Sequence, residues 1–414
     1  MALPAWMPLI RAAVGVSILV SCLSCGGGKG SGAALTPGDP SGGTQPATAN
    51  VLTVVADAGP ADSSVNTLFT SVTVCVPGSS TNCQTIDHIQ VDTASYGLRI
   101  LASTLNLALP VRAAANGGSL VECTVFADGY AWGPVAVADV QLSGETAASV
   151  PIQVIGDPSF SNVPADCSGA APMEEDTVAA FGANGILGIG VFAQDCGPNC
   201  VTTAESSAYY ACSSTACQAT TVPLADQVTN PVTLFAQDNN GSILELPSVA
   251  AQGALTLTGS LIFGIDTQSN NASGTQTVLT LDPDFGYLTV LFNGQTLSQS
   301  FIDTGSNGIY FDDADLVQCT ESNFSDFYCP STTQNLTATL QGANGMSAAV
   351  NFGIANAQQQ ATNNPDFTVL PQLGGPVPTS SSFDFGLPFY FGRRVATALE
   401  SQSTSVGTGP YIAY

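Results

Sequence analysis

The feature that most constrains the fold of this chain is a short motif that occurs twice. Residues 91–100 read VDTASYGLRI, and residues 301–310 read FIDTGSNGIY. A repeat at about half the chain length indicates two structurally equivalent lobes. Each copy carries one carboxylate, Asp92 or Asp303, followed by Thr, a small residue and Ser. Two equivalent lobes would therefore bring a pair of carboxylates together, which is the arrangement that acid–base chemistry with one shared proton requires.

Length and composition favour a two-lobed, all-β chain. A chain of 414 residues is longer than a single hydrophobic core usually supports, which favours two lobes. Only 9% of the residues are charged, whereas long surface helices are rich in Glu, Lys and Arg, so the composition favours strands. The Asn-Asn-Gly turn signal at residues 239–241 marks a boundary between a first lobe over residues 51–243 and a second over residues 244–414. One short helix is expected at residues 314–319. Short β-branched runs bounded by turn residues predict strands at residues 51–55, 68–76, 120–127, 135–142, 255–265, 276–281, 287–292 and 336–340.

The N-terminus reads as an export signal followed by a tether. Residues 1–22 contain one positive side chain, Arg11, and then a short apolar core that ends in Leu-Val-Ser-Cys. This ending fits a bacterial lipoprotein processing site with Cys22 as the acylated residue; Cys25 is the rival site, and an ordinary cleaved signal peptide is the alternative. Residues 23–50 are rich in Gly, Ser and Pro, which is typical of a flexible tether. We therefore expect a lipid-anchored protein of the bacterial cell envelope, on the periplasmic or outer-membrane side.

The cysteines indicate disulfide bonds. Ten cysteines follow residue 50, and an even number in an exported chain is typical of a disulfide framework. A zinc site in the cluster at residues 196–217 is the alternative, but an oxidising compartment argues against it. The expected pairs are Cys75 with Cys83, Cys319 with Cys329 and, by elimination, Cys123 with Cys167, with two bridges of open connectivity among Cys196, Cys200, Cys212 and Cys217.

The charge and the rare residue types exclude several classes of function. A formal net charge of −25 with a single Lys excludes nucleic acid as a partner, because phosphate binding needs clustered Lys and Arg. The same charge argues against electrostatic adhesion to anionic lipid, so the lipid anchor is the membrane contact that we expect. His88 is the only histidine, and we interpret it as structural, so a Ser-His-Asp or Cys-His site is not credible. The sequence holds no phosphate-cradling loop and no metal-ligand cluster, so we expect neither cofactor nor metal, and we expect a monomer.

The two Asp motifs resemble those of the pepsin-like aspartic peptidases, a bilobal all-β family with pseudo-two-fold symmetry and a cleft between the lobes. In that family each lobe donates one Asp from an apolar-apolar-Asp-Thr-Gly-Ser/Thr motif. Residues 185–190 (GILGIG) and 383–389 (FDFGLPF) resemble the glycine-containing turns that lie behind the two catalytic loops. The resemblance implies that the catalytic pair is Asp92 and Asp303, that Thr93 and Thr304 lock the loops together, and that Ser95 and Ser306 hydrogen-bond the carboxylates.

Two further stretches resemble landmarks of the family. Residues 123–133 resemble the flap hairpin that closes over bound peptide, which implies substrate-binding roles for Phe126, Gly129, Tyr130 and Trp132. Residues 259–266 resemble the strand that opens the second lobe. Two departures stand out: Ala94 replaces the family's glycine in the first motif, and Phe126 replaces its flap tyrosine, for which Tyr130 or Trp132 would compensate. No tryptophan follows the first motif to orient the flap residue.

The resemblance implies an aspartic endopeptidase that acts on extended polypeptide through a water held between Asp92 and Asp303. The alternative is a catalytically inactive envelope lipoprotein that binds peptide, glycan or an envelope partner, and the departures at Ala94 and Phe126 favour it. The retention of both Asp-Thr pairs with their serines favours the enzyme, because a binding cleft has no chemical need for two carboxylates. A purely structural envelope protein is the third interpretation.

Overall fold

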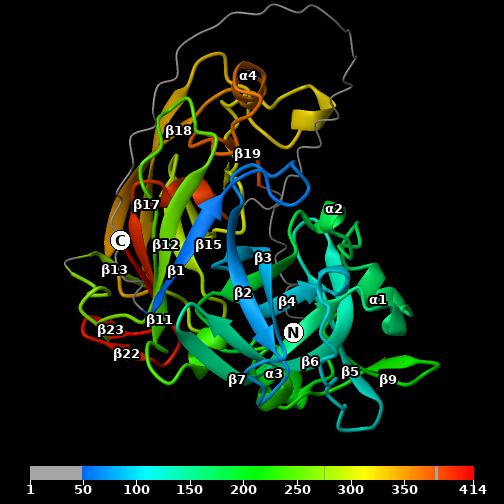
Figure 1. The fold of residues 1–414 in the computed structure, drawn as a ribbon. Helices are drawn as coiled ribbons and strands as arrows, with labels where there is room; N and C mark the ends of the chain where they lie inside the picture. The colour runs from blue at the N-terminus through cyan, green and yellow to red at the C-terminus, as the bar shows by residue number, and fades with distance from the viewer. Residues whose placement is uncertain (1–48, 275, 378–380) are drawn as a thin grey trace, which may run out of the picture.

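The computed structural model describes residues 49–274, 276–377 and 381–414. The expected signal peptide, most of the tether and both candidate lipidation sites, Cys22 and Cys25, lie outside the described residues. Most strands of the first half of the chain lie on one side of Figure 1, and most of those of the second half lie on the other. Two groups of strands built from the two halves of the chain agree with the predicted all-β, two-lobed architecture.

The first half contributes ten strands and three short helices to the described structure. Their bounds are β1 (Val51–Ala56), β2 (Leu68–Cys75), β3 (Cys83–Asp92), β4 (Tyr96–Leu101), β5 (Ser119–Val125), β6 (Tyr130–Leu142), β7 (Glu145–Ile155), α1 (Ala165–Ser168), α2 (Val178–Phe181), β8 (Gly185–Ile189), α3 (Pro198–Thr202), β9 (Tyr209–Cys212) and β10 (Cys217–Ala219).

The second half contributes fourteen strands and one helix to the described structure. Their bounds are β11 (Gly241–Glu245), β12 (Leu257–Phe263), β13 (Val278–Thr280), β14 (Leu288–Phe292), β15 (Gln295–Ile302), β16 (Ile309–Tyr310), β17 (Gln334–Gln341), β18 (Ser347–Ile354), α4 (Ala357–Asn363), β19 (Gly374–Gly375), β20 (Asp384–Phe385), β21 (Arg394–Ala398), β22 (Ser403–Thr404), β23 (Gly407–Thr408) and β24 (Tyr411–Ala413).

One large sheet joins the two halves. Among the described residues, fifteen strands pair in the order β10-β9-β5-β6-β7-β4-β8-β3-β2-β1-β12-β11-β21-β24-β13, and seven more pair as β18-β17-β14-β15-β20-β16-β19. The crossing point is the antiparallel pairing of β1 with β12, from Val51 opposite Ile262 to Ala56 opposite Leu257. Strand β11, in which the expected lobe boundary falls, pairs with β12 and β21 of the second half. The lobes are therefore tied together by backbone hydrogen bonds as well as by side chains.

Alternation of side chains explains the strands. On β6, Ala138, Val140 and Leu142 are buried, whereas the residues between them are partly exposed, as expected when one face of a strand packs on a core. The main apolar cluster takes members from both halves, among them Val91 and Leu187 from the first and Phe311 and Phe385 from the second. Each of the eight runs predicted as strands overlaps an observed strand.

The predicted helix at residues 314–319 is wrong. The segment makes a single turn, in which the Leu316 N–H donates to the Asp313 carbonyl at 3.2 Å, and then becomes extended. The reason is the Cys319–Cys329 disulfide, which holds the segment against its neighbour. Two backbone hydrogen bonds, from Cys319 N–H to Phe327 O and from Cys329 N–H to Val317 O, pair the two segments and prevent a second helical turn.

All ten cysteines after residue 50 form disulfides, as predicted. The three pairs proposed from the sequence are present, and the open pairs of the cluster are Cys196 with Cys200 and Cys212 with Cys217. Since these cysteines are bonded to each other, the cluster has no free thiolate for zinc.

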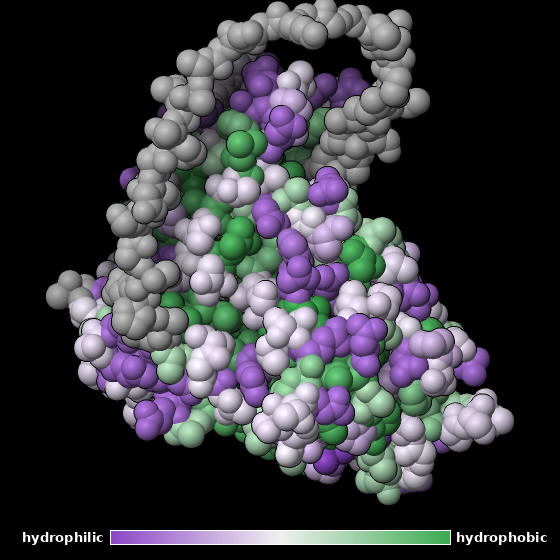
Figure 2. All heavy atoms as spheres, in the orientation of Figure 1, coloured by the Kyte–Doolittle hydropathy of each residue, from purple (hydrophilic) through white to green (hydrophobic). Residues whose placement is uncertain are grey.

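The face shown in Figure 2 mixes hydrophilic residues with small scattered groups of apolar ones. No helix in the described part of the chain is both long and apolar enough to cross a membrane.

Candidate active site

The two Asp motifs lie on loops that are built in the same way. Asp92 ends β3, which pairs in parallel with β8, and β8 in turn pairs antiparallel with β4. In the second half, β15 pairs in parallel with β20, and β20 pairs antiparallel with β16. Asp303 directly follows β15, and its backbone N–H donates to the Phe385 carbonyl at 3.0 Å. The repeat in sequence is therefore a repeat in structure, and the two turns predicted behind the catalytic loops are β8 and β20.

The Asp92 carboxylate accepts three hydrogen bonds from its own loop. Its Oδ1 atom accepts the backbone N–H groups of Ala94 at 2.7 Å and of Ser95 at 3.1 Å. Its Oδ2 atom accepts the Ser95 hydroxyl at 2.8 Å. Hydrogen bonds of this kind stabilise the ionised form of a carboxyl group.

The Asp303 carboxyl group has the matching pair of contacts. The Gly305 N–H donates to Oδ1 at 2.6 Å, and the Ser306 hydroxyl donates to Oδ2 at 2.9 Å. Burial raises the pKa of Asp303 well above its ordinary value, and the nearby charges of Asp92 and Asp384 raise it further. Asp303 therefore keeps its proton to a higher pH than an exposed aspartate does.

Gly305 shows how closely the two carboxyl groups approach. A Cβ atom on Gly305 would lie 3.0 Å from Asp303 Oδ1, 3.0 Å from Asp92 Oδ2 and 2.9 Å from Asp92 Cγ. Both carboxyl groups therefore border the same point, and both residues are fully buried. Since each carboxyl group has an oxygen 3.0 Å from that point, these two oxygens are at most about 6 Å apart, a distance at which one negative charge disfavours a second.

The two loops are locked by reciprocal threonine contacts, as the resemblance implied. The Thr93 N–H donates to Thr304 Oγ1 at 3.1 Å, and the Thr304 N–H donates to Thr93 Oγ1 at 3.0 Å. The Thr304 hydroxyl also donates to the Val91 carbonyl at 2.8 Å. Tyr390, from the second half, lies within hydrogen-bond distance of Thr93 Oγ1 at 2.9 Å. These contacts fix the relative position of the two carboxyl groups.

Ala94 fits where the family has glycine. Its backbone is not in the left-handed region, so an alanine meets no backbone strain there. Its methyl group packs beside the apolar cluster that contains Phe126 and Ile186. The hydrogen bond from its N–H to Asp92 is retained. The first loop therefore has room for a side chain at this position, whereas the second loop has none at Gly305.

The predicted flap is a β-hairpin. Strands β5 and β6 pair from Val121 opposite Pro134 to Val125 opposite Tyr130, and the turn closes through Phe126 N–H to Gly129 O at 2.8 Å. The hairpin is held from outside, because β9 pairs with β5 and the Cys123–Cys167 disulfide crosses to α1.

The side chains predicted to bind substrate are largely occupied within this structure. Phe126 is 1% exposed and packs edge-on against Phe181 with ring centroids 5.9 Å apart. Trp132 is buried, and its indole N–H donates to the Phe160 carbonyl at 2.6 Å. Tyr130 is buried, and its backbone pairs with Met173 and Glu175. A Cβ atom on Gly129 would contact Glu175, so the close approach of that residue requires glycine. Their roles in substrate binding remain predictions.

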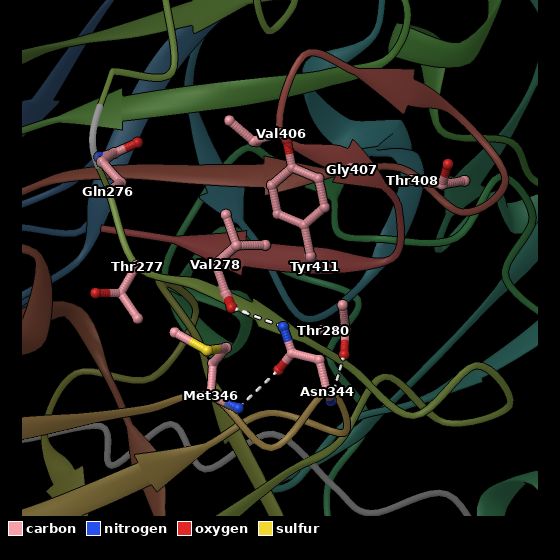
Figure 3. A pocket seen from close by; sticks show the side chains of 10 residues that line it. All are labelled: Gln276, Thr277, Val278, Thr280, Asn344, Met346, Val406, Gly407, Thr408 and Tyr411. Carbon is pink, nitrogen blue, oxygen red and sulfur yellow. Dashed lines mark hydrogen bonds between the residues drawn. The ribbon is translucent and has the colours of Figure 1, made fainter.

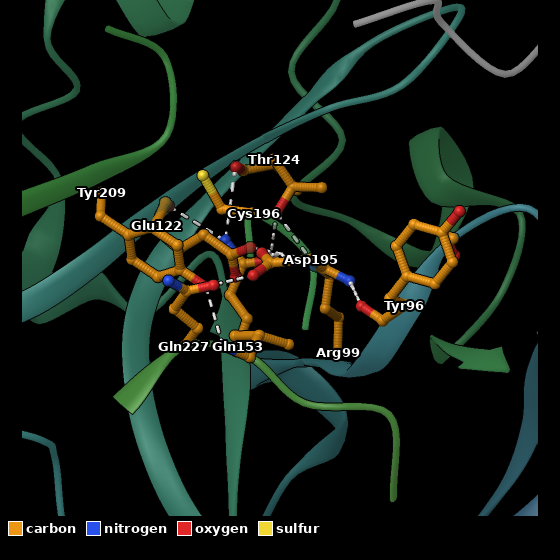
Figure 4. A network of polar contacts seen from close by, with 12 residues as sticks. Tyr96, Arg99, Glu122, Thr124, Gln153, Asp195, Cys196, Tyr209 and Gln227 are labelled. Atoms are coloured by element: carbon orange, nitrogen blue, oxygen red, sulfur yellow. Dashed lines mark hydrogen bonds and ion pairs between the residues drawn. The ribbon is translucent and has the colours of Figure 1, made fainter. Parts of the chain in front are cut away.

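A buried ionic network, drawn in Figure 4, links the first Asp loop to the hairpin. Arg99, seven residues after Asp92, donates to Glu122 at 2.6 Å and to Thr124 at 2.9 Å, both on β5. It also donates to Asp195 at 3.0 Å, and Asp195 accepts the Tyr209 hydroxyl at 2.6 Å. Burial and the neighbouring Glu122 raise the pKa of Asp195 well above its ordinary value. Arg99 thus connects β4, which follows the first Asp loop, to strand β5 of the hairpin.

Three residues of the site were not identified from the sequence. Arg99 is a charged residue within the first Asp motif and Asp384 one within the second predicted turn, and the charged groups that act on them come from distant parts of the chain. Tyr390 lies in a short 3₁₀ helix, Leu387–Tyr390, directly after the second turn. For Arg99 and Asp384 the available signal was a charged residue among apolar neighbours whose pattern indicates burial.

His88 is partly exposed and packs on Phe69 with ring centroids 5.3 Å apart, which agrees with a structural role.

Other parts of the described structure do not compete as catalytic centres. No group of His, Cys, Asp and Glu in the described residues has the arrangement of a metal site. A surface pocket of ≈ 460 Å³, shown in Figure 3, lies along β13 and the β22–β23 hairpin. Amide, hydroxyl and apolar side chains line it, with Tyr411 as its one ionisable residue, so it offers no acid–base pair.

Comparisons with known proteins agree with this geometry. The family described as "Protein of unknown function (DUF3443)" matches residues 46–414. The chain belongs to that family. No curated protein matches the sequence. The crystal structure of an aspartic proteinase from Irpex lacteus matches with a TM-score of 0.51 and 15% sequence identity, over 88% of this chain and 96% of that chain. This member of the DUF3443 family therefore has the bilobal, all-β fold of the pepsin-like aspartic proteinases.

Proposed function

We propose that this protein is an aspartic endopeptidase whose catalytic pair is Asp92 and Asp303. The observation that carries the proposal is the approach of both carboxyl groups to one point beside Gly305, on loops locked by Thr93 and Thr304. Two buried carboxyl groups that border the same point are costly to keep, and acid–base catalysis gives a reason for keeping them. Likeness of fold to the Irpex lacteus proteinase supports the proposal.

The mechanism follows from the different surroundings of the two carboxyl groups. Asp92, which accepts three hydrogen bonds, is the ionised member and removes a proton from a water held between the pair. Asp303, whose raised pKa keeps its proton, donates to the oxygen of the scissile carbonyl as the water oxygen attacks the carbonyl carbon. The tetrahedral product of this step collapses when a proton passes to the leaving amine and the carbon–nitrogen bond breaks. Ser95 and Ser306 hold the carboxyl groups in place throughout.

An extended polypeptide is the substrate class that this arrangement suits. The hairpin of β5 and β6 would cover the bound chain, with its Phe126–Gly129 turn nearest the reacting bond. The strong negative charge of the protein favours substrates that do not add negative charge to the site.

The proposal is tested with the purified full-length protein and a reduced, alkylated protein as unfolded substrate. We expect cleavage with a bell-shaped pH profile in the acidic range, whose two limbs report the coupled pair. A peptide mimic with a hydroxyl group at the scissile position should inhibit by displacing the shared water. If the protein binds the same peptides specifically but does not cleave them from pH 3 to 7, the peptidase hypothesis is wrong and the binding-lipoprotein hypothesis takes its place.

We also infer that the enzyme is anchored in the cell envelope through Cys22 or Cys25. Its support is the lipoprotein-like sequence at residues 19–22, the tether that follows and the five disulfides of the folded body. Exchange of both Cys22 and Cys25 for Ser should move the protein from the membrane fraction to the released fraction. Unchanged fractionation of this double variant would contradict the anchor.

A further inference from the structure

A third carboxyl group, that of Asp384, lies beside the two Asp loops. Asp384 opens β20 and is opposite Phe301 of β15 on one side and Tyr310 of β16 on the other. The next residue, Phe385, accepts the backbone hydrogen bond of Asp303. Asp384 is therefore fixed from both sides within the layer of strands that carries Asp303.

The side chain of Asp384 points away from the apolar core of the second lobe. Phe383 and Phe385 stack on each other in that core with ring centroids 4.3 Å apart. Because side chains alternate along a strand, Asp384 lies on the opposite face, which it shares with its register partner Tyr310. In the first lobe the equivalent position opposite Gln90 is Ile186, an apolar residue in the cluster beneath the hairpin. The second lobe thus has a carboxyl group where the first lobe has an apolar side chain.

The Asp384 carboxyl group is buried without a cation or a hydrogen-bond partner among the described residues. Asp384 is fully buried, and neither carboxyl oxygen has a hydrogen bond there. The Ser306 hydroxyl is near enough to favour its charged form, but that hydroxyl donates its one proton to Asp303. Burial and the charge of Asp92 raise the pKa of Asp384 well above its ordinary value. An unpaired buried carboxylate is costly, so the group keeps its proton in acid.

Asp384 and the catalytic pair act on one another through their charges. The titratable groups that act in this region are Asp92 and Asp303 from the two loops, Tyr310 from β16 and Tyr390 from the following 3₁₀ helix. A negative charge on Asp384 raises the pKa of Asp303, of Tyr310 and of Tyr390. Of these groups Asp303 is the one that holds the proton required for catalysis.

We propose that Asp384 is a third acid of the active site, which stays protonated in acid and whose negative charge, once its proton leaves, holds the shared proton on Asp303 to higher pH. The inference rests on the proposed function and deepens it, because it assigns a residue that sets the upper pH limit of activity. Asp384 contacts no reacting atom in this scheme, so it is a positioning residue that acts through Asp303.

The kinetic test uses two variants of different shape and one matched control. Asp384→Asn keeps the size of the side chain, and Asp384→Ile introduces the residue found at the equivalent position in the first lobe. In both, the alkaline limb of the kcat/KM profile should move to lower pH by about one unit or more, while the acid limb stays in place. Asp315→Asn, which removes a charge from an exposed position, should leave both limbs unchanged. An unmoved alkaline limb in both Asp384 variants would overturn the proposal.

A second readout separates this inference from the peptidase proposal. Infrared spectra of protein labelled with ¹³C at aspartate carboxyl groups report protonated carboxyls without any substrate. The wild type should retain a buried protonated carboxyl band above pH 5 that is absent in Asp384→Asn, and the band of Asp303 should titrate at lower pH in the variant. This pattern without cleavage would reject the peptidase and keep the third acid, whereas cleavage without such a band in the wild type would reject the third acid alone.

Discussion

Thr93 and Thr304 exchange hydrogen bonds across the junction of the two lobes, each donating its backbone N–H to the hydroxyl of the other, at 3.1 and 3.0 Å. Both residues are buried, so neither N–H has water as a substitute partner. Because the two threonines directly follow Asp92 and Asp303, this exchange determines how far apart the two aspartates lie. The relative position of the two carboxyl groups is thus set by buried contacts between a backbone N–H and a short side chain in each direction.

Replacement of either threonine by valine should destabilise the protein and reduce cleavage. Valine keeps the shape of threonine but removes the hydroxyl, which leaves a buried N–H unpaired at a cost of about 1–3 kcal/mol in the free energy of unfolding. Denaturant unfolding measures this change. Thr337→Val, at an exposed position of β17, should change stability by less than about 0.5 kcal/mol. Equal effects at the three positions would mean that the threonine exchange has no special role.

Exchange of the small residues in the two Asp motifs should have opposite outcomes. Gly305→Ala places a methyl group 2.9 Å from Asp92 Cγ, so the loop or the carboxylate must move. A displacement of about 1 Å at a catalytic group can lower the rate about 100-fold, and we expect a loss of this order in kcat. Ala94→Gly should leave kcat equal or higher and lower the free energy of unfolding by about 0.5–1 kcal/mol. Steady-state kinetics of the two variants measure these effects. A Gly305→Ala variant that is as active as the wild type would contradict this geometry.

Arg99 should contribute strongly to stability at neutral pH. Arg99→Met leaves the buried carboxyl group of Glu122 and the partly buried one of Asp195 without their cation, and breaking a buried ion pair in this way costs about 3–5 kcal/mol. Arg112→Met, which breaks a partly exposed pair with Asp226, should cost about 1 kcal/mol or less. Chemical unfolding at pH 7 compares the two. A similar small effect for both would show that the network in Figure 4 is not needed to hold the hairpin.

Stability should fall as the pH rises above about 4, the ordinary pKa of aspartate. Asp195 has a pKa raised by burial and by Glu122, so the folded protein binds a proton that the unfolded chain has already released. Its contribution is fully present below the unfolded pKa and is lost as the pH rises through the folded pKa. Asp195→Asn should therefore flatten the dependence of Tm on pH between 4 and 7. A variant with the same slope as wild type would assign the dependence to other groups.

The sequence predicted the parts of the molecule that are marked by repetition or by residue type. The duplicated Asp-Thr motif identified both loops, because a turn that places a buried carboxylate needs the same small and hydroxyl residues in each lobe. Cysteine spacing identified the Cys75–Cys83 and Cys319–Cys329 pairs but left the pairing within residues 196–217 open, and β-branched runs identified strands. Ala94 is a departure from the family pattern whose effect the sequence left open, and in the structure its backbone is outside the left-handed region.

The remaining features depend on contacts between distant residues and could not be read from local patterns. The partners of Arg99 lie on β5 and in the loop that contains Asp195, and no spacing in the sequence links them. Asp384 stands between two phenylalanines in a turn where its neighbours indicate only an apolar strand. The helix expected at residues 314–319 failed because a disulfide and two backbone hydrogen bonds outweighed local propensity. The orientation of Phe126 likewise depends on Phe181, which a single sequence does not place.

The most direct test of the account is cleavage of an unfolded protein by Asp92→Asn and Asp303→Asn, compared with wild type across pH 3 to 7. Asparagine keeps the shape of each side chain but cannot exchange the catalytic proton. We expect each variant to lose at least about 1,000-fold in kcat/KM while its Tm stays within a few degrees of wild type. If both variants cleave the substrate as the wild type does, Asp92 and Asp303 are not the catalytic pair and the protein is not an aspartic peptidase.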